Sequence, residues 1–227
     1  VIQTARVLGI ETPLEYDYTI ALGSNGVKLF EFTRAYGAFA NGGFVVQPYA
    51  VERVETSRGK VVYKAPKTKI THQLSMNTAA EMTAMMKTVI THGTGRAANF
   101  GKPAAGKTGT TDDNKDAYFM GYTPNIVAGV WVGNDDNTAL NKSIQGGTVP
   151  ALIWKDIMKV ATEPYGKAEF NYPEVELMPF AAGSNVKIIG EQDEQNKPAE
   201  QEKPAATPET AEPVKLPESV KNTEQAK

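Results

Sequence analysis

Three short β-prone runs follow one another in the middle of the chain and constrain its fold more than any other feature. They lie at residues 104–111, 117–122 and 126–133. Turn-forming residues fill the first connection, 112–116, and Thr123-Pro124-Asn125 makes the second. Because connections this short join antiparallel neighbours, the sequence predicts an antiparallel sheet built from these runs.

Helical patterns surround the predicted sheet. The spacing of apolar residues predicts a buried helix over 27–41 that ends at Gly42-Gly43, through Leu29, Phe30, Phe32, Ala35, Tyr36 and Phe39. A second helix is predicted over 77–91, with Asn77 as its N-terminal cap. An amphipathic helix over 149–161 is expected to pack on the sheet through Leu152, Ile153, Ile157, Met158 and Val160.

Residues 45–56 and 60–64 predict two strands joined by the turn Ser57-Arg58-Gly59. Together with the helices and the three central strands, this hairpin gives an α+β fold class, an antiparallel sheet covered by helices. Residues 191–227 differ from the rest. They contain five prolines, no aromatic residue, nine acidic and five basic residues, a net charge of −4. This composition predicts a disordered, acidic and Pro-rich tail.

Composition also limits the chemistry. A net charge of −2 for 227 residues gives no basic footprint for nucleic acid, so no nucleic-acid partner is expected. The absence of cysteine excludes disulfides and thiolate metal sites. His72 and His92 stand twenty residues apart without an acidic ligand pattern around them, so neither a metal nor a cofactor is predicted.

The run from Gly106 to Thr111 puts an ammonium and three hydroxyls on one predicted strand. Alternation separates its side chains into two faces, with Lys107, Gly109 and Thr111 on one and Gly106, Thr108 and Thr110 on the other. A strand without bulk at Gly109 would let a second extended backbone lie close beside it. Lys107 and the threonine hydroxyls could then receive the carboxylate of a peptide, provided that it sits at the edge of the strand.

These residues also carry a resemblance. Lys107-Thr108-Gly109 is similar to the third of three motifs shared by penicillin-binding proteins and serine β-lactamases. Other stretches resemble the class A penicillin-binding proteins, the bifunctional peptidoglycan synthases, namely 21–24, 35–43, Gly93-Thr94-Gly95 and 116–124. The resemblance implies that residues 1–165 form the C-terminal part of a penicillin-binding, β-lactamase-like transpeptidase domain, followed by an extension at 166–190 and the tail at 191–227.

In that family a serine attacks the D-Ala-D-Ala bond of a peptidoglycan stem peptide, and β-lactam antibiotics acylate the same serine. The resemblance implies a catalytic role for Lys107 beside the serine and for the Thr110 backbone N–H as half of an oxyanion hole. Substrate or antibiotic would be bound by Thr108, Gly109, Thr110 and Thr111. It also implies a place in the bacterial cell envelope, on the periplasmic face of the inner membrane.

The family's other two motifs are not expected within these residues. Ser57-Arg58-Gly59-Lys60 fits Ser-x-x-Lys but falls in the predicted turn, where Ser and Lys do not lie one helical turn apart. Ser75-Met76-Asn77 fits Ser-x-Asn but falls at a predicted helix start. The resemblance therefore implies that this chain is part of a longer protein, whose preceding part holds the nucleophile, a glycosyltransferase domain and a membrane anchor.

Two other functions remain open from the sequence. Residues 101–108 match the phosphate-binding loop pattern letter for letter, which would indicate a nucleotide-binding domain. That loop must follow a buried strand and open a helix at its Lys-Thr, and residues 109–114 are a poor helix start. The other alternative is a non-catalytic cell-wall scaffold module that keeps the strand but has lost the chemistry.

Overall fold

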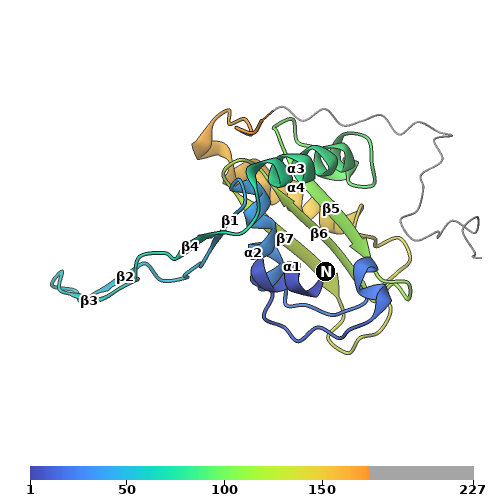
Figure 1. Ribbon diagram of the computed structural model, residues 1–227, viewed down its shortest axis with the longest axis horizontal. Coiled ribbons are helices and arrows are strands. Elements are labelled where there is room, and N and C mark those ends of the chain that lie inside the picture. The colour runs from blue at the N-terminus through green and yellow to red at the C-terminus, as the bar shows by residue number, and fades with distance from the viewer. Residues whose placement is uncertain (174–227) are drawn as a thin grey trace, which may run out of the picture. The chain divides into compact units, whose positions relative to one another are not determined.

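The structure of the protein is a computed structural model that describes residues 1–173 (Figure 1). The predicted tail at 191–227 and most of the predicted extension at 166–190 lie outside the described residues. The described part combines helices with antiparallel strands, so the predicted α+β fold class is confirmed.

The three central strands form one antiparallel sheet in the order β5-β6-β7, as predicted. Their bounds are Ala105–Thr110, Asp116–Tyr122 and Val127–Gly133. The middle strand β6 is buried on both faces: Ala117 and Phe119 are fully buried on one, and Met120 and Tyr122 are almost fully buried on the other. This double burial explains why β6 reads as a nearly continuous apolar run rather than an alternating one.

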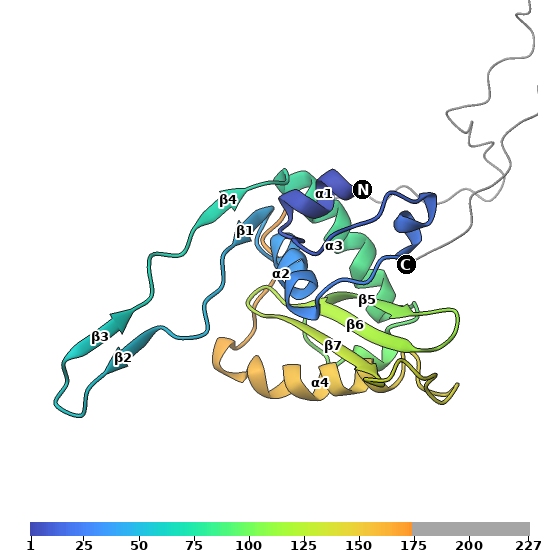
Figure 2. The same cartoon turned by 90° about the horizontal axis from the view of Figure 1, so that it is seen from below.

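Helices cover both faces of this sheet (Figure 2). α2 (Leu29–Ala40) contacts β6 and β7 on one face, where α3 (Met76–Thr91) contacts β5. α4 (Val149–Ala161) packs on the opposite face, and α1 (Ile2–Val7) lies beside α2. Short 3-10 helices are η1 (Tyr18–Leu22), η2 (Arg96–Ala98) and η3 (Glu163–Tyr165). Among residues 1–173, we find no helix with the length and apolar character that a bilayer crossing requires.

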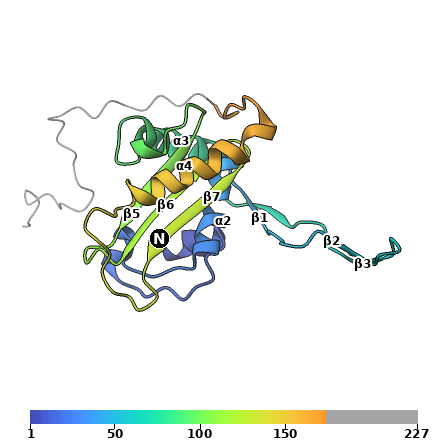
Figure 3. The same cartoon turned by 180° about the vertical axis from the view of Figure 1, so that it is seen from behind.

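α4 lies across one face of the sheet (Figure 3). The core on that side is centred on Trp154, which is fully buried. Its ring meets Phe119 edge to face at 5.2 Å, and its Nε1–H donates to the Ala128 carbonyl at 3.1 Å. The predicted bounds of α4 are confirmed, but the predicted packing face is wrong except for Met158. The helix turns Ala151, Trp154 and Met158 toward the sheet, and the exposed residues are Leu152, Ile153, Ile157 and Val160.

Details at α2 and α3 also correct the predictions. Leu29 and Phe30 are exposed on α2, whereas Glu31 is buried. On α3 the cap is Ser75 rather than Asn77, because the Ser75 hydroxyl accepts a hydrogen bond from the Thr78 N–H at 3.0 Å.

The predicted hairpin is divided into two ladders. β1 (Phe44–Val46) pairs with β4 (Ile70–His72), and β2 (Arg53–Glu55) pairs with β3 (Val61–Lys64). Pro48 stands two residues after the end of β1 and has no N–H for a ladder, so the predicted strand 45–56 is interrupted there. The turn at 57–59 is confirmed by the hydrogen bond from the Thr56 N–H to the Lys60 carbonyl. This two-stranded ribbon extends away from the sheet (Figures 1 and 2).

Candidate functional site

Strand β5 has a strand neighbour on one side only within residues 1–173. The Thr111 N–H donates to the Asp116 carbonyl at 3.0 Å, and the register continues with Thr110 opposite Ala117. Because alternate residues of an antiparallel strand bond to the partner, Lys107, Gly109 and Thr111 direct their backbone groups toward β6. Gly106, Thr108 and Thr110 therefore direct their N–H and C=O groups to the open side, where no described backbone group bonds to them.

Lys107 places its ammonium at this open edge. Its side chain is exposed, and Nζ donates to the Thr108 carbonyl at 2.9 Å, a carbonyl that points off the free side of β5. No carboxylate in the described part of the chain forms an ion pair with it. The alternation predicted from the sequence had put Lys107 and the two threonines on different faces. Because Lys107 Nζ bonds to the Thr108 carbonyl, its charge lies at the open edge of β5, which Thr108 and Thr110 can also reach.

Thr110 is held by a loop that sequence reasoning missed. The Gly146 N–H donates to Thr110 Oγ1 at 3.0 Å. A Cβ at Gly146 would lie 2.4 Å from the Gly109 carbonyl oxygen and 2.5 Å from the Tyr118 carbonyl oxygen, so only glycine fits against the sheet there. The Gly146-Gly147 pair before the α4 pattern was the available signal. Since Thr110 Oγ1 accepts from the loop, its hydroxyl hydrogen can be donated to a ligand.

Thr108 has a different partner. Its Oγ1 lies 2.7 Å from Oγ1 of Thr94, in the turn between α3 and η2. The sequence marked Gly93-Thr94-Gly95 as part of the resemblance but gave Thr94 no role. Two hydroxyls thus meet on the α4 side of β5, next to its open edge.

Gly109 and Thr111 have structural explanations that the sequence analysis lacked. A Cβ at Gly109 would lie 2.2 Å from Tyr118 Cζ, so the aromatic ring fills the face above this glycine. A second backbone could therefore lie beside Gly109 only at the open edge of β5, which stays a prediction. Thr111 Oγ1 accepts from the N–H groups of Lys115 and Asp116, both at 2.9 Å, and so closes the β5–β6 turn.

The phosphate-binding loop is contradicted by the structure. Residues 105–110 form a strand where that loop would open a helix, and the preceding element is a 3-10 helix rather than a buried strand. Lys102 donates to the carbonyl and hydroxyl oxygens of Thr162, each at 3.1 Å. Among residues 1–173, no three His, Cys, Asp or Glu side chains gather in a way that could hold a metal ion.

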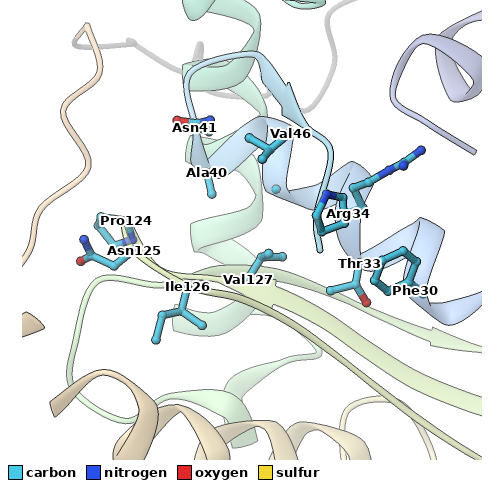
Figure 4. A pocket seen from close by; sticks show the side chains of 12 residues that line it. Phe30, Thr33, Arg34, Ala40, Asn41, Val46, Pro124, Asn125, Ile126 and Val127 are labelled. Carbon is cyan, nitrogen blue, oxygen red and sulfur yellow. The ribbon is translucent and has the colours of Figure 1, made fainter. Parts of the chain in front are cut away.

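A groove of about 440 Å³ lies elsewhere, between α2 and the β6–β7 turn (Figure 4). Its lining is mainly apolar, for example Phe30, Ile126 and Val127, and includes no residue of β5. Arg34 is its charged member, and the Arg34 guanidinium is already bonded to the Gly9 carbonyl and to Gln47. The groove therefore lacks the reactive groups of an active site, and the β5 edge remains the candidate.

Comparisons with known proteins identify the family to which the chain belongs. Residues 12–159 match the family described as the penicillin binding protein transpeptidase domain. The chain is 34% identical over 184 residues to penicillin-binding protein 1A of Aquifex aeolicus, covering 76% of the chain and 24% of that protein. For penicillin-binding protein 1A of Rickettsia prowazekii the identity is 31% over 212 residues, covering 83% and 26%. The chain thus spans about a quarter of the length of these relatives.

Solved structures show the same fold. Penicillin-binding protein 1A from Haemophilus influenzae superimposes with a TM-score of 0.66 at 25% identity, covering 77% of this chain and 31% of that one. PonA1 from Mycobacterium tuberculosis in complex with penicillin V gives a TM-score of 0.64 at 26% identity, covering 77% and 52%.

Proposed function

Because this chain belongs to the penicillin-binding protein transpeptidase family, we propose that it forms the Lys-Thr-Gly part of a peptidoglycan D,D-transpeptidase. The observation that carries the proposal is the open edge of β5, where the Lys107 ammonium lies beside outward-facing backbone groups. A free strand edge can take up an extended peptide, and a cation with hydroxyls suits its terminal carboxylate.

The proposed substrate is a stem peptide ending in D-Ala-D-Ala. Its carboxylate accepts hydrogen bonds from Lys107 and from the hydroxyls of Thr108 and Thr110, while its backbone pairs with the β5 edge beside Gly109. A serine oxygen attacks the carbonyl between the two alanines, and the Thr110 N–H supports the oxyanion. The C–N bond then breaks as the leaving D-Ala amine takes the proton that the serine hydroxyl gave up. An acceptor amine later displaces the serine oxygen, which regains a proton from that amine. A β-lactam follows the first half of this path and stays on the serine. Of the predicted substrate-binding residues, Thr111 receives least support because its oxygen closes the turn.

We place the serine nucleophile and the Ser-x-Asn motif outside these 227 residues. Ser57 lies in the β2–β3 turn, where Ser and Lys do not stand one helical turn apart, and the Ser75 hydroxyl is used as the cap of α3. The glycosyltransferase domain and the membrane anchor belong, in this proposal, to the rest of a longer protein on the periplasmic face of the inner membrane. Within the chain, residues 1–165 are the transpeptidase part and 166–190 its extension.

Labelled penicillin tests this division of the protein. The isolated chain should remain unlabelled, whereas the longer protein that contains it should be labelled covalently at one serine. Labelling of the isolated chain at Ser57 or Ser75 would contradict the placement of the nucleophile. An unlabelled longer protein that still binds stem peptides would favour the scaffold alternative.

Lys107→Ala in the longer protein tests the site itself. The Lys107 ammonium is the cation proposed to lie beside the reacting serine. Its loss should slow acylation by roughly 10²–10³-fold, the range seen when an oxyanion-stabilising group is removed. Lys115→Ala is the matched control, because Lys115 is a partly exposed lysine of the neighbouring turn, paired with Asp113 at 3.5 Å. The control should acylate at the unaltered rate, and equal rates for both variants would remove Lys107 from the mechanism.

A further inference from the structure

The turn Gly93-Thr94-Gly95 is fixed to the end of α3 by its backbone. The Gly93 N–H donates to the Thr88 carbonyl at 2.9 Å, and the Gly95 N–H donates to the Val89 carbonyl at 3.0 Å. A Cβ at Gly93 would lie 2.8 Å from Val89 Cα, so a side chain there would push the turn away from the helix. These contacts fix the backbone of Thr94 relative to the end of α3.

The same turn is packed from two further sides. A Cβ at Gly95 would lie 3.0 Å from the Phe119 ring, which belongs to the face of β6 that α4 covers. On the other side, a Cβ at Gly147 would lie 2.2 Å from the Thr94 carbonyl oxygen. The helix, the sheet and the 143–148 loop thus all determine where the Thr94 side chain stands.

Thr94 is exposed, and its Oγ1 lies 2.7 Å from Thr108 Oγ1. A carboxylate only accepts hydrogen bonds, so a threonine that binds one must donate its own hydroxyl hydrogen to it. The neighbour of that threonine must then be the donor. Thr110 already meets this condition, because it accepts from the Gly146 N–H. Thr94 can act as the donor to Thr108, as the Gly146 N–H does to Thr110.

We propose that Thr94 is a positioning residue of the β5 site, which donates its hydroxyl hydrogen to Thr108 Oγ1 and thereby aims the Thr108 hydroxyl at the ligand carboxylate. The chain of donors runs from Thr94 to Thr108 to the carboxylate, and each bond in such a chain strengthens the next. In this arrangement the Gly146 N–H is the donor to Thr110, and the Thr94 hydroxyl is the donor to Thr108. This inference rests on the proposed function, since it assigns Thr94 to the same anionic subsite.

Acylation of the longer protein by labelled penicillin provides the test. Thr94→Val removes the hydroxyl but keeps the shape, and we expect the second-order acylation constant to fall about five- to tenfold, as for loss of one or two net hydrogen bonds. Thr94→Ser should restore at least half of the original constant. Thr91→Val is the matched control, because the Thr91 hydroxyl bonds only to the Lys87 carbonyl and to His92 in the described structure; it should leave acylation unchanged.

A double-variant cycle separates positioning from simple structural support. In a Thr108→Val background, Thr94→Val should change acylation less than twofold, because the Thr108 hydroxyl that Thr94 orients is already absent. An equal loss in both backgrounds, or a fall in melting temperature that parallels the loss of acylation, would overturn the positioning role. Wild-type acylation together with an unaffected Thr94→Val would overturn this inference alone, whereas failure of the wild-type protein to be acylated would overturn the proposed function and this inference with it.

Discussion

Glu31 shows how one side chain can organise a region that its sequence pattern does not reveal. Its carboxylate is buried on α2 and accepts from the Thr12 N–H at 2.8 Å, the Thr12 hydroxyl at 2.8 Å and the Glu11 N–H at 2.9 Å. These bonds, first that from the Thr12 N–H, outweigh the opposing effect of burial and lower the pKa of Glu31 to about 2. Glu31 thus ties the segment before residue 13 to α2.

This lowered pKa predicts a stability that depends on acid pH. The ordinary pKa of a glutamate is 4.5, so the folded state holds the charged form more tightly than the unfolded state does. The contribution is complete above pH 4.5 and is lost as the pH falls toward about 2. Urea unfolding between pH 7 and pH 3 should therefore show a smaller loss of stability on acidification for Glu31→Gln than for the wild-type protein. The same pH dependence in both would contradict the assignment.

At the scale of elements, the apolar periodicity of α4 specifies where the helix begins and ends but not which of its faces packs on the sheet. Its predicted bounds are those observed, yet most of the residues predicted to pack on the sheet are exposed. The helix carries apolar residues around much of its circumference, so the period alone does not select a face. Trp154 selects it, because the indole fits against Phe119 and Phe100 and bonds to the Ala128 carbonyl.

Two substitutions on α4 should differ sharply in their cost. Trp154→Ala empties the centre of the core and should destabilise the fold by about 3–5 kcal/mol. Ile157 is 47% exposed, so Ile157→Ala should cost only about 0.5 kcal/mol. Urea midpoints with equal m-values would measure both. Similar losses would contradict the conclusion that Trp154 selects the packed face of α4.

At the scale of the whole described molecule, stability is unevenly distributed. The sheet is covered on both faces, whereas every residue of β2 and β3 is exposed and the two strands chiefly contact each other. An isolated two-stranded ladder is marginally stable in water. The ribbon therefore depends on the β1–β4 ladder, which joins it to the body of the protein at Gly43 and Leu74.

Hydrogen exchange should reveal this difference. Amides of β2 and β3 are expected to exchange at nearly unprotected rates, while those of β6, which bond on both sides within the covered sheet, should be protected most strongly. Peptide-resolved mass spectrometry after deuterium labelling measures both in one sample. Equal protection of the ribbon and of β6 would contradict this prediction, because it would require a contact that stabilises β2 and β3 beyond those found within residues 1–173.

The sequence by itself determined the local elements and the identity of the reactive groups. Turn residues between β-prone runs specified the antiparallel order of the central strands, and the residues at 107–110 supplied the cation and hydroxyls of the candidate site. Both depend on neighbours in the chain, which a sequence displays directly.

Only the tertiary structure decided which groups meet. Thr94 and Gly146 lie fourteen and thirty-six residues from their partners Thr108 and Thr110, and no local pattern encodes such pairs. The same holds for the ring of Tyr118 over Gly109, the burial of Glu31 and the face of α4. These outcomes arise because packing selects among several faces and contacts that local preferences leave nearly equal in free energy.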